Sequence, residues 1–178
     1  MKRILMMALS VMLLFTGCGK GGDPAPSASA DPSQGAVPGS YTVPEGWVKS
    51  EKYSTDAQLF YVEEGHEEDE TPDNISIHVG ENRYALEEHA QFRDAIVQQL
   101  LVQLDGIEAE LNGDGTYTEQ GDLLYIFTID EGDVVTVQYY IVKDYGFCLI
   151  QLTNFSGSES ANEAARTMVD SFIWNAES

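Results

Sequence analysis

The sequence predicts an α+β domain in which an antiparallel sheet of about six strands is layered with helices. The second half of the chain contains runs of β-forming residues separated by short turn sequences, which is typical of antiparallel neighbours. Its two longest runs, LLYIFTI and VVTVQYYIV, are apolar on both alternating faces and therefore need cover on both sides. Two other segments have helical periodicity and supply that cover.

The first 17 residues have the layout of a secretory signal peptide. Two basic residues precede an apolar stretch at 4–15, which is shorter than the about 20 apolar residues that cross a bilayer. The sequence FTGC at 15–18 then resembles the bacterial lipobox, with Phe15 where leucine is usual. This resemblance implies cleavage before Cys18 and a lipid on its thiol. Ordinary secretion with a free Cys18 is the alternative.

Residues 18–40 are predicted to be the lipidated cysteine followed by a flexible linker. Residues 19–40 are mostly Gly, Pro, Ala and Ser, so they offer little apolar surface to offset the entropy of ordering. Such a tether has a root-mean-square span of about 25 Å and an extended limit of about 75 Å. Globular composition begins at Tyr41, which predicts one domain over residues 41–178.

The first half of this domain is predicted to contain three strands and a helix. The strands are 41–43, 58–62 and 74–79, and Trp47 is expected in the core. Residues 86–104 change to helical spacing, and Gly106 marks the end of this helix. Its predicted apolar stripe contains Phe92, Ile96, Val97, Leu100, Leu101 and Leu104.

The second half is predicted to be a run of strands followed by a second helix. A hairpin of strands 107–111 and 116–119 is expected to turn at residues 112–115, Asn-Gly-Asp-Gly. Further turns at 130–133 and 143–146 connect the next three strands. These strands are 123–129, 134–142 and 147–153. A capping box formed by Ser160 and Glu163 is expected to open a helix that continues to Phe172.

Several segments of the domain resemble the PsbP-like family. They are YTVPEGW at 41–47, NISI at 74–77 and MVDSFIW at 168–174, together with the middle helix and the strand meander. That family includes the extrinsic P subunit of photosystem II, a Ran-binding branch in eukaryotes and bacterial lipoproteins of unassigned role. The resemblance implies an α/β/α sandwich with an antiparallel sheet. It transfers no function, because one fold hosts unrelated activities.

The net charge limits the possible partners. The chain carries −21 at neutral pH, and removal of Lys2 and Arg3 with the signal peptide makes this −23. Such acidity argues against nucleic acid, which needs a basic surface, and against a domain that lies flat on anionic lipid.

The sequence contains no recognisable catalytic or metal-binding motif. His66, His78 and His89 form no helical zinc pair and accompany no cysteine ligand or nucleophile elbow, so each is predicted to be a surface or half-buried side chain. We therefore assign no catalytic residue, no metal ligand and no cofactor. A hydrolase whose site only the fold assembles is an alternative.

Two acidic segments invite a calcium interpretation. EEGHEEDETPD at 63–73 carries seven carboxylates, but a solvated loop is the preferred interpretation over weak cation binding. In residues 110–122 several ligand positions match a calcium loop, yet Gly121 stands where the bidentate Glu belongs. We predict a hairpin turn there.

Aromatic residues and Cys148 are assigned to the core. Tyr125, Phe127, Tyr139 and Tyr140 suit either a ligand groove or sheet packing, and packing is preferred. Cys148 lies in an apolar run without a neighbouring base, which predicts a buried thiol.

These observations predict a lipoprotein held on the extracytoplasmic face of a bacterial membrane through Cys18. The expected role is a non-catalytic binding or accessory module for an envelope protein. Capture of a solute or cation is the alternative from another class.

Overall fold

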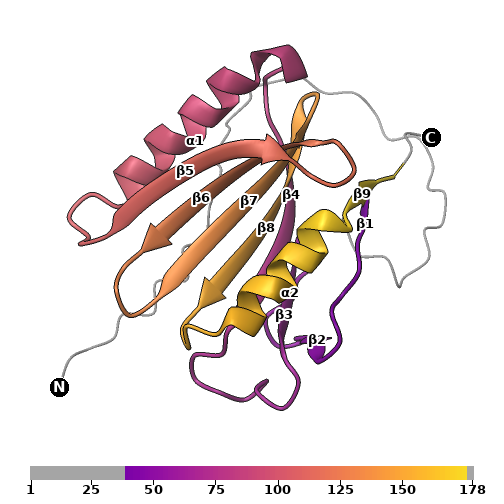
Figure 1. The fold of residues 1–178 in the computed structure, drawn as a ribbon, viewed down its shortest axis with the longest axis vertical. Helices are drawn as coiled ribbons and strands as arrows, with labels where there is room; N and C mark the ends of the chain where they lie inside the picture. The colour runs from indigo at the N-terminus through magenta and orange to yellow at the C-terminus, as the bar shows by residue number, and fades with distance from the viewer. Residues whose placement is uncertain (1–38, 176–178) are drawn as a thin grey trace, which may run out of the picture. The chain divides into compact units, whose positions relative to one another are not determined.

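The computed structural model describes residues 39–175, which lie in one compact unit. They form a seven-stranded antiparallel sheet and a separate two-stranded pair (Figure 1). The strands of the large sheet are β2 (Trp47–Lys49), β3 (Gln58–Glu63), β4 (Asn74–Glu81), β5 (Glu110–Tyr117), β6 (Leu123–Asp130), β7 (Val135–Lys143) and β8 (Gly146–Asn154). Their spatial order is β2-β3-β4-β8-β7-β6-β5.

Two α-helices cover opposite faces of the sheet. A short 3₁₀ turn, η1 (Leu86–Glu88), leads into α1 (His89–Gln103), and α2 (Glu159–Asp170) follows β8. Figure 1 shows α2 in front of the sheet and α1 behind it. The predicted α+β class and the sandwich implied by the resemblance are therefore confirmed, with seven strands rather than about six. Among residues 39–175, no helix is long and apolar enough to cross a membrane.

Alternation along the central strands builds a core on each face. On β7, Tyr139 and Ile141 join the cluster that contains Ala165, Met168 and Phe172 of the α2 region. The intervening Tyr140 packs instead against Phe92 of α1, with ring centroids 5.8 Å apart. These strands are apolar on both faces because each face has its own helix.

The apolar stripe of α1 is narrower than predicted. Phe92, Ile96 and Leu100 are buried, whereas Leu101 is 51% exposed. The predicted C-terminal end of the helix, residue 104, is within one residue of the observed end at Gln103. Gly106 follows with a positive φ of 80°, as expected of a helix stop.

The predicted hairpin at 107–119 is wrong. Residues 110–117 form one continuous strand, β5, and the expected turn residues 112–115 pair with Thr128, Phe127, Ile126 and Tyr125 of β6. Gly113 and Gly115 do not have positive φ. They serve close approach instead, because a Cβ on them would come within 3.2 Å of Phe127 and 3.1 Å of Tyr125.

The strand predicted at 41–43 is also misplaced. The first strand is β1 (Gly39–Ser40), which pairs with β9 (Ile173–Trp174) outside the large sheet. Tyr41 then turns inward, and its hydroxyl lies 2.7 Å from that of Tyr61. Residues 39 and 40, which the sequence assigns to the linker, therefore belong to the folded domain.

The predicted capping box of α2 does not form. The helix begins at Glu159 with Ser158 as N-cap, so Ser160 lies inside the first turn. Side chains of Asp73 and Asn154 organise the preceding turn: Asp73 accepts from the backbone N–H groups of Phe155 and Ser156 at 2.7 and 3.0 Å. Asn154 Oδ1 accepts from Gly157 N–H at 2.8 Å. These contacts replace the local cap because they already order the entering chain.

Candidate functional site

The predicted lipid-bearing residue, Cys18, lies outside the described residues, as do the predicted signal peptide and residues 19–38 of the linker. The anchor therefore stays a prediction. The domain itself offers several places to examine for chemistry.

The three histidines have separate partners and form no common site. His66 is exposed, and its Nδ1 lies 2.7 Å from Asp69 Oδ2, which raises the pKa of this histidine above its usual range. His78 Nδ1 lies 3.3 Å from the carbonyl oxygen of Ala57. His89 Nδ1 lies 2.6 Å from the Tyr125 hydroxyl. The prediction of surface or half-buried histidines is confirmed.

The acidic segment 63–73 is not uniform. Asp73 is the last residue of the loop between β3 and β4 and holds the turn before α2, whereas Glu68 in the middle of the same loop lies 3.9 Å from Lys52. Across residues 39–175, no group of three or more His, Cys, Asp or Glu side chains is placed to hold a metal ion.

The aromatic residues and Cys148 are core residues, as predicted. Tyr125, Phe127 and Tyr140 are at most 5% exposed, and Tyr139 is buried on the opposite face of the sheet. The four rings therefore do not line one groove. Cys148 is fully buried, and burial raises the pKa of its thiol, which disfavours the reactive thiolate.

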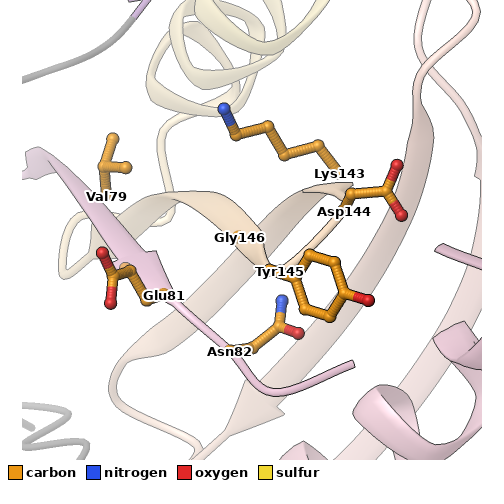
Figure 2. A pocket seen from close by; sticks show the side chains of 8 residues that line it. Val79, Glu81, Asn82, Lys143, Asp144, Tyr145 and Gly146 are labelled. Atoms are coloured by element: carbon orange, nitrogen blue, oxygen red, sulfur yellow. The ribbon is translucent and has the colours of Figure 1, made fainter. Parts of the chain in front are cut away.

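A hollow of about 460 Å³ lies where the end of β4 meets the turn between β7 and β8 (Figure 2). It is lined by residues 79–82 and 143–146. Tyr145 forms one wall in a left-handed conformation, with a φ of 55°, and the residue is 60% exposed. Lys143 reaches the ring of Trp174, with Nζ 4.8 Å from the ring centroid. The lining contains no Ser, Thr, Cys or His.

Asn82 in the wall of this hollow has an unpaired hydrogen-bond donor. Its Oδ1 accepts from the backbone N–H of Tyr84 at 2.8 Å, which fixes the orientation of the amide. The residue is 9% exposed, and its Nδ2 group is buried without a hydrogen-bond partner. Figure 2 shows this nitrogen turned toward the space between Glu81 and Tyr145. A buried donor without an acceptor costs free energy, but less than 1 Å² of this nitrogen is exposed, so a ligand reaches it only if the wall of the hollow opens.

The second candidate is the free edge of β5. This strand is eight residues long and pairs only with β6 among the described residues. Seven of its residues are exposed, and only Leu111 is half-buried. It contains no Pro, no Lys and no Arg, which are the residues that commonly protect an edge.

The hydrogen-bond register shows which backbone groups face outward. Thr118 N–H donates to the Asp122 carbonyl at 2.9 Å, so residues of the same parity in β5 face β6. The intervening residues direct their N–H and C=O groups away from the sheet. These outward residues are Leu111, Gly113, Gly115 and Tyr117. In agreement, Gly115 N–H bonds the Asp114 side chain at 2.8 Å rather than a β6 carbonyl.

The surroundings of this edge are acidic. Residues 105–122 contain six Asp and Glu side chains and no Lys, Arg or His. The carboxylates nearest the middle of the strand are those of Glu110 and Asp114, and both are on exposed residues. Sequence reasoning missed this edge because it interpreted the two glycines as a turn. The aromatic pair Tyr125 and Phe127 on the neighbouring predicted strand was the available signal, since aromatic side chains can pack over glycines of an edge strand.

Comparison with known proteins supports the fold only. No family model and no curated protein matches the chain. The chain is similar to the solution structure of cyanobacterial PsbP (CyanoP) from Synechocystis sp. PCC 6803, with 15% identity, a TM-score of 0.53 and coverage of 90% of this chain and 98% of that chain. A crystal structure from Bacteroides thetaiotaomicron VPI-5482 has 15% identity and a TM-score of 0.43, covering 79% of this chain and 46% of that chain.

The similarity to CyanoP extends over 98% of the CyanoP chain. At 15% identity it concerns architecture and not activity. The chain has the PsbP-like fold.

Proposed function

We propose that this protein is a non-catalytic binding module, tethered to the extracytoplasmic face of a membrane through a lipid on Cys18, that holds a protein of the cell envelope. The free edge of β5 is the single observation that carries the proposal. Unprotected edges attract further strands, and most folded proteins shield them. A long exposed edge is therefore a natural place for a partner chain to bind without any rearrangement of the domain.

The other edge of the sheet makes β5 the better candidate. β2 is only three residues long and contains Lys49, and Pro44 precedes it. A partner strand there would gain few backbone hydrogen bonds. The proposed tether complements this arrangement, because a flexible linker keeps the domain near the membrane while it samples partners.

Site-specific photo-crosslinking in intact cells tests the protein-binding role. A crosslinker at Asn112 of β5 is expected to capture a defined envelope protein, and one at Lys49 of β2 is expected to capture much less of it. Both positions are exposed, so they form a matched pair. Equal capture from both edges, or none from Asn112, would argue against β5 as the binding edge.

The anchor is tested separately by Cys18→Ala. This substitution should release the protein from membranes or leave its precursor uncleaved, because only a thiol accepts the lipid. Membrane fractionation and intact mass measurement of the wild type and the variant provide the readout. An unmodified N-terminus in the mature wild type would contradict the lipoprotein assignment.

The unpaired Nδ2 group of Asn82 suggests a second candidate function, capture of a small solute whose hydrogen-bond acceptor reaches this group when the wall of the hollow opens. Asn82→Asp is a suitable variant, because it keeps an oxygen for Tyr84 N–H and removes the donor. Thermal-shift measurements with small carboxylates and sugars should show stabilisation of the wild type that the variant loses. If no solute at millimolar concentration raises the wild-type Tm, this candidate is excluded.

A further inference from the structure

We infer that the β5 edge binds an extended segment of another protein as an added strand, and that this segment alternates apolar residues with Lys or Arg. The inference rests on the proposed protein-binding function and specifies its chemistry. It follows from three features of β5: the outward backbone groups, the two glycines and the acidic face.

The backbone of β5 is ready for an added strand. Leu111, Gly113, Gly115 and Tyr117 direct their N–H and C=O groups outward at every second residue, which is the spacing that a strand ladder needs. No Cβ shields the two central residues. The Asp114 carboxylate, which accepts from Gly115 N–H, is on an exposed side chain and gives way to a partner carbonyl.

The α1 side of this edge favours apolar partner residues. The side chains of Leu111 and Tyr117 are on the same face as Phe127 and Tyr125, their neighbours along this side of the sheet. Tyr117 is 69% exposed, so it presents an aromatic surface that a partner side chain would cover. Between these two residues the glycines have no side chain, and the rings of Phe127 and Tyr125 lie against them, so the apolar surface continues from Leu111 to Tyr117.

The opposite face of β5 favours basic partner residues. Glu110 and Asp114 are on this face together with Asn112 and Thr116, and Glu110 is directly across from Asp130 of β6. An added strand places every second side chain beside them. Opposite charges on neighbouring strands stabilise the pairing, and like charges oppose it.

The same charges disfavour a second copy of this chain as the occupant. Two β5 strands paired edge to edge would bring Glu110 and Asp114 of both copies together, within a surface where residues 105–122 have no basic side chain. A basic segment removes this repulsion. The occupant is therefore a different protein with an alternating apolar and basic strand.

An NMR titration of the full 178-residue chain in detergent micelles tests the inference. The probe is a nine-residue peptide of alternating Val and Lys. We expect it to perturb and protect the amides of residues 111, 113, 115 and 117, and to leave those of 112, 114 and 116 protected as before. A peptide of alternating Val and Glu should bind at least about tenfold more weakly.

Two controls separate strand addition from simple ion pairing. A Val-Lys peptide with N-methylated valines keeps its charge but loses alternate backbone donors, so it should not protect the β5 amides. Tyr117→Pro removes an outward N–H and should weaken binding of the Val-Lys peptide at least about tenfold. Lys49→Pro places the matched substitution on the other edge and should leave binding unchanged. Equal binding of the methylated peptide, or perturbation centred on residues 63–73, would overturn the inference.

The remaining outcomes are also decisive. Concentration-dependent protection of the same amides without peptide would identify a second copy as the occupant and overturn the inference. So would a lack of any response at millimolar peptide. If an envelope protein is crosslinked equally well in wild type and Tyr117→Pro, the proposed function stands and strand addition fails. If the peptide binds as expected but no envelope protein is captured, the proposed function fails alone.

Discussion

The two edge strands of the large sheet, β2 and β5, differ in length, in burial and in charge. At one edge, β2 has three residues, and Ser50 N–H continues its pairing with β3 by donating to the Phe60 carbonyl at 2.8 Å. Trp47 of β2 is 7% exposed and packs in the core. The Lys49 Nζ atom lies 3.2 Å from Glu51 Oε1. At the other edge, β5 has eight residues, two central glycines and no basic side chain. The fold protects one edge by shortness and charge and leaves the other available.

This difference shows that edge protection is not a general property of the fold. The short edge is attached to the N-terminal segment and to the loop that contains the acidic residues, and Lys52 lies 3.9 Å from Glu68 of that loop. The long edge has no comparable neighbour among the described residues beyond β6. We propose that this long edge persists because a partner strand uses it.

The largest effect is expected from proline substitutions at neighbouring positions of β5. Thr116→Pro removes an N–H that faces β6, so it should lower the free energy of unfolding by about 2–3 kcal/mol. Tyr117→Pro removes an outward N–H and should cost less than about 1 kcal/mol. Urea unfolding of both variants measures the difference. Equal destabilisation would break the comparison, because the outward register would then be wrong.

A smaller effect tests the polar contacts of the turn before α2, which lies at the ends of the central strands β4 and β8 and not at either edge. Asp73→Ala leaves the N–H groups of Phe155 and Ser156 without their acceptor, and it also removes a contact with the Ser156 hydroxyl. The expected loss is about 1–2 kcal/mol, comparable to loss of a helix cap. Glu70→Ala in the same loop is the control and should change stability by less than about 0.5 kcal/mol. Similar values for both would mean that the turn before α2 is ordered by other contacts.

The smallest expected effect is the pH dependence of the stability that the contact between His66 and Asp69 contributes. Because Asp69 raises the pKa of His66, the contact contributes most when the histidine is protonated. The contribution is complete below the unfolded pKa of about 6.5 and is lost as pH rises through the higher folded value. NMR titration should show a lower His66 pKa in Asp69→Asn. An unchanged titration would show that the contact does not persist in solution.

The sequence predicted those parts of the fold that depend on local periodicity. Ile75 and Ile77 alternate on a strand and are buried, and Phe92, Ile96 and Leu100 are spaced for one face of a helix. These patterns report burial directly, because a residue's neighbours in sequence determine which face it shares. The sequence did not predict the strand order, because β4 pairs with β8 and more than sixty residues separate these two strands in the chain.

The failures had a common physical cause. Gly113 and Gly115 were assigned to a turn because glycine often adopts positive φ, but here their small size accommodates the rings of Phe127 and Tyr125. The capping box at Ser160 failed because Asp73, distant in sequence, already orders the turn before α2. The hollow beside Asn82 had no sequence signal, since its lining comes from two separated segments. The sequence around each of these positions did not reveal which distant residue would pack against it or form its hydrogen bonds.

The pairing of β1 with β9 has a mechanical consequence. Any pull on the chain ahead of Gly39 reaches this two-residue pair before it reaches the large sheet, where β4 and β8 are held along eight residues of β4. The weaker pair should therefore open first. Release of residues 39–46 would add about 25 Å of reach at roughly 3.3 Å per residue, and Trp47 would still be in place. The domain would thus yield a short length of chain under load while the surface of β5 stays intact.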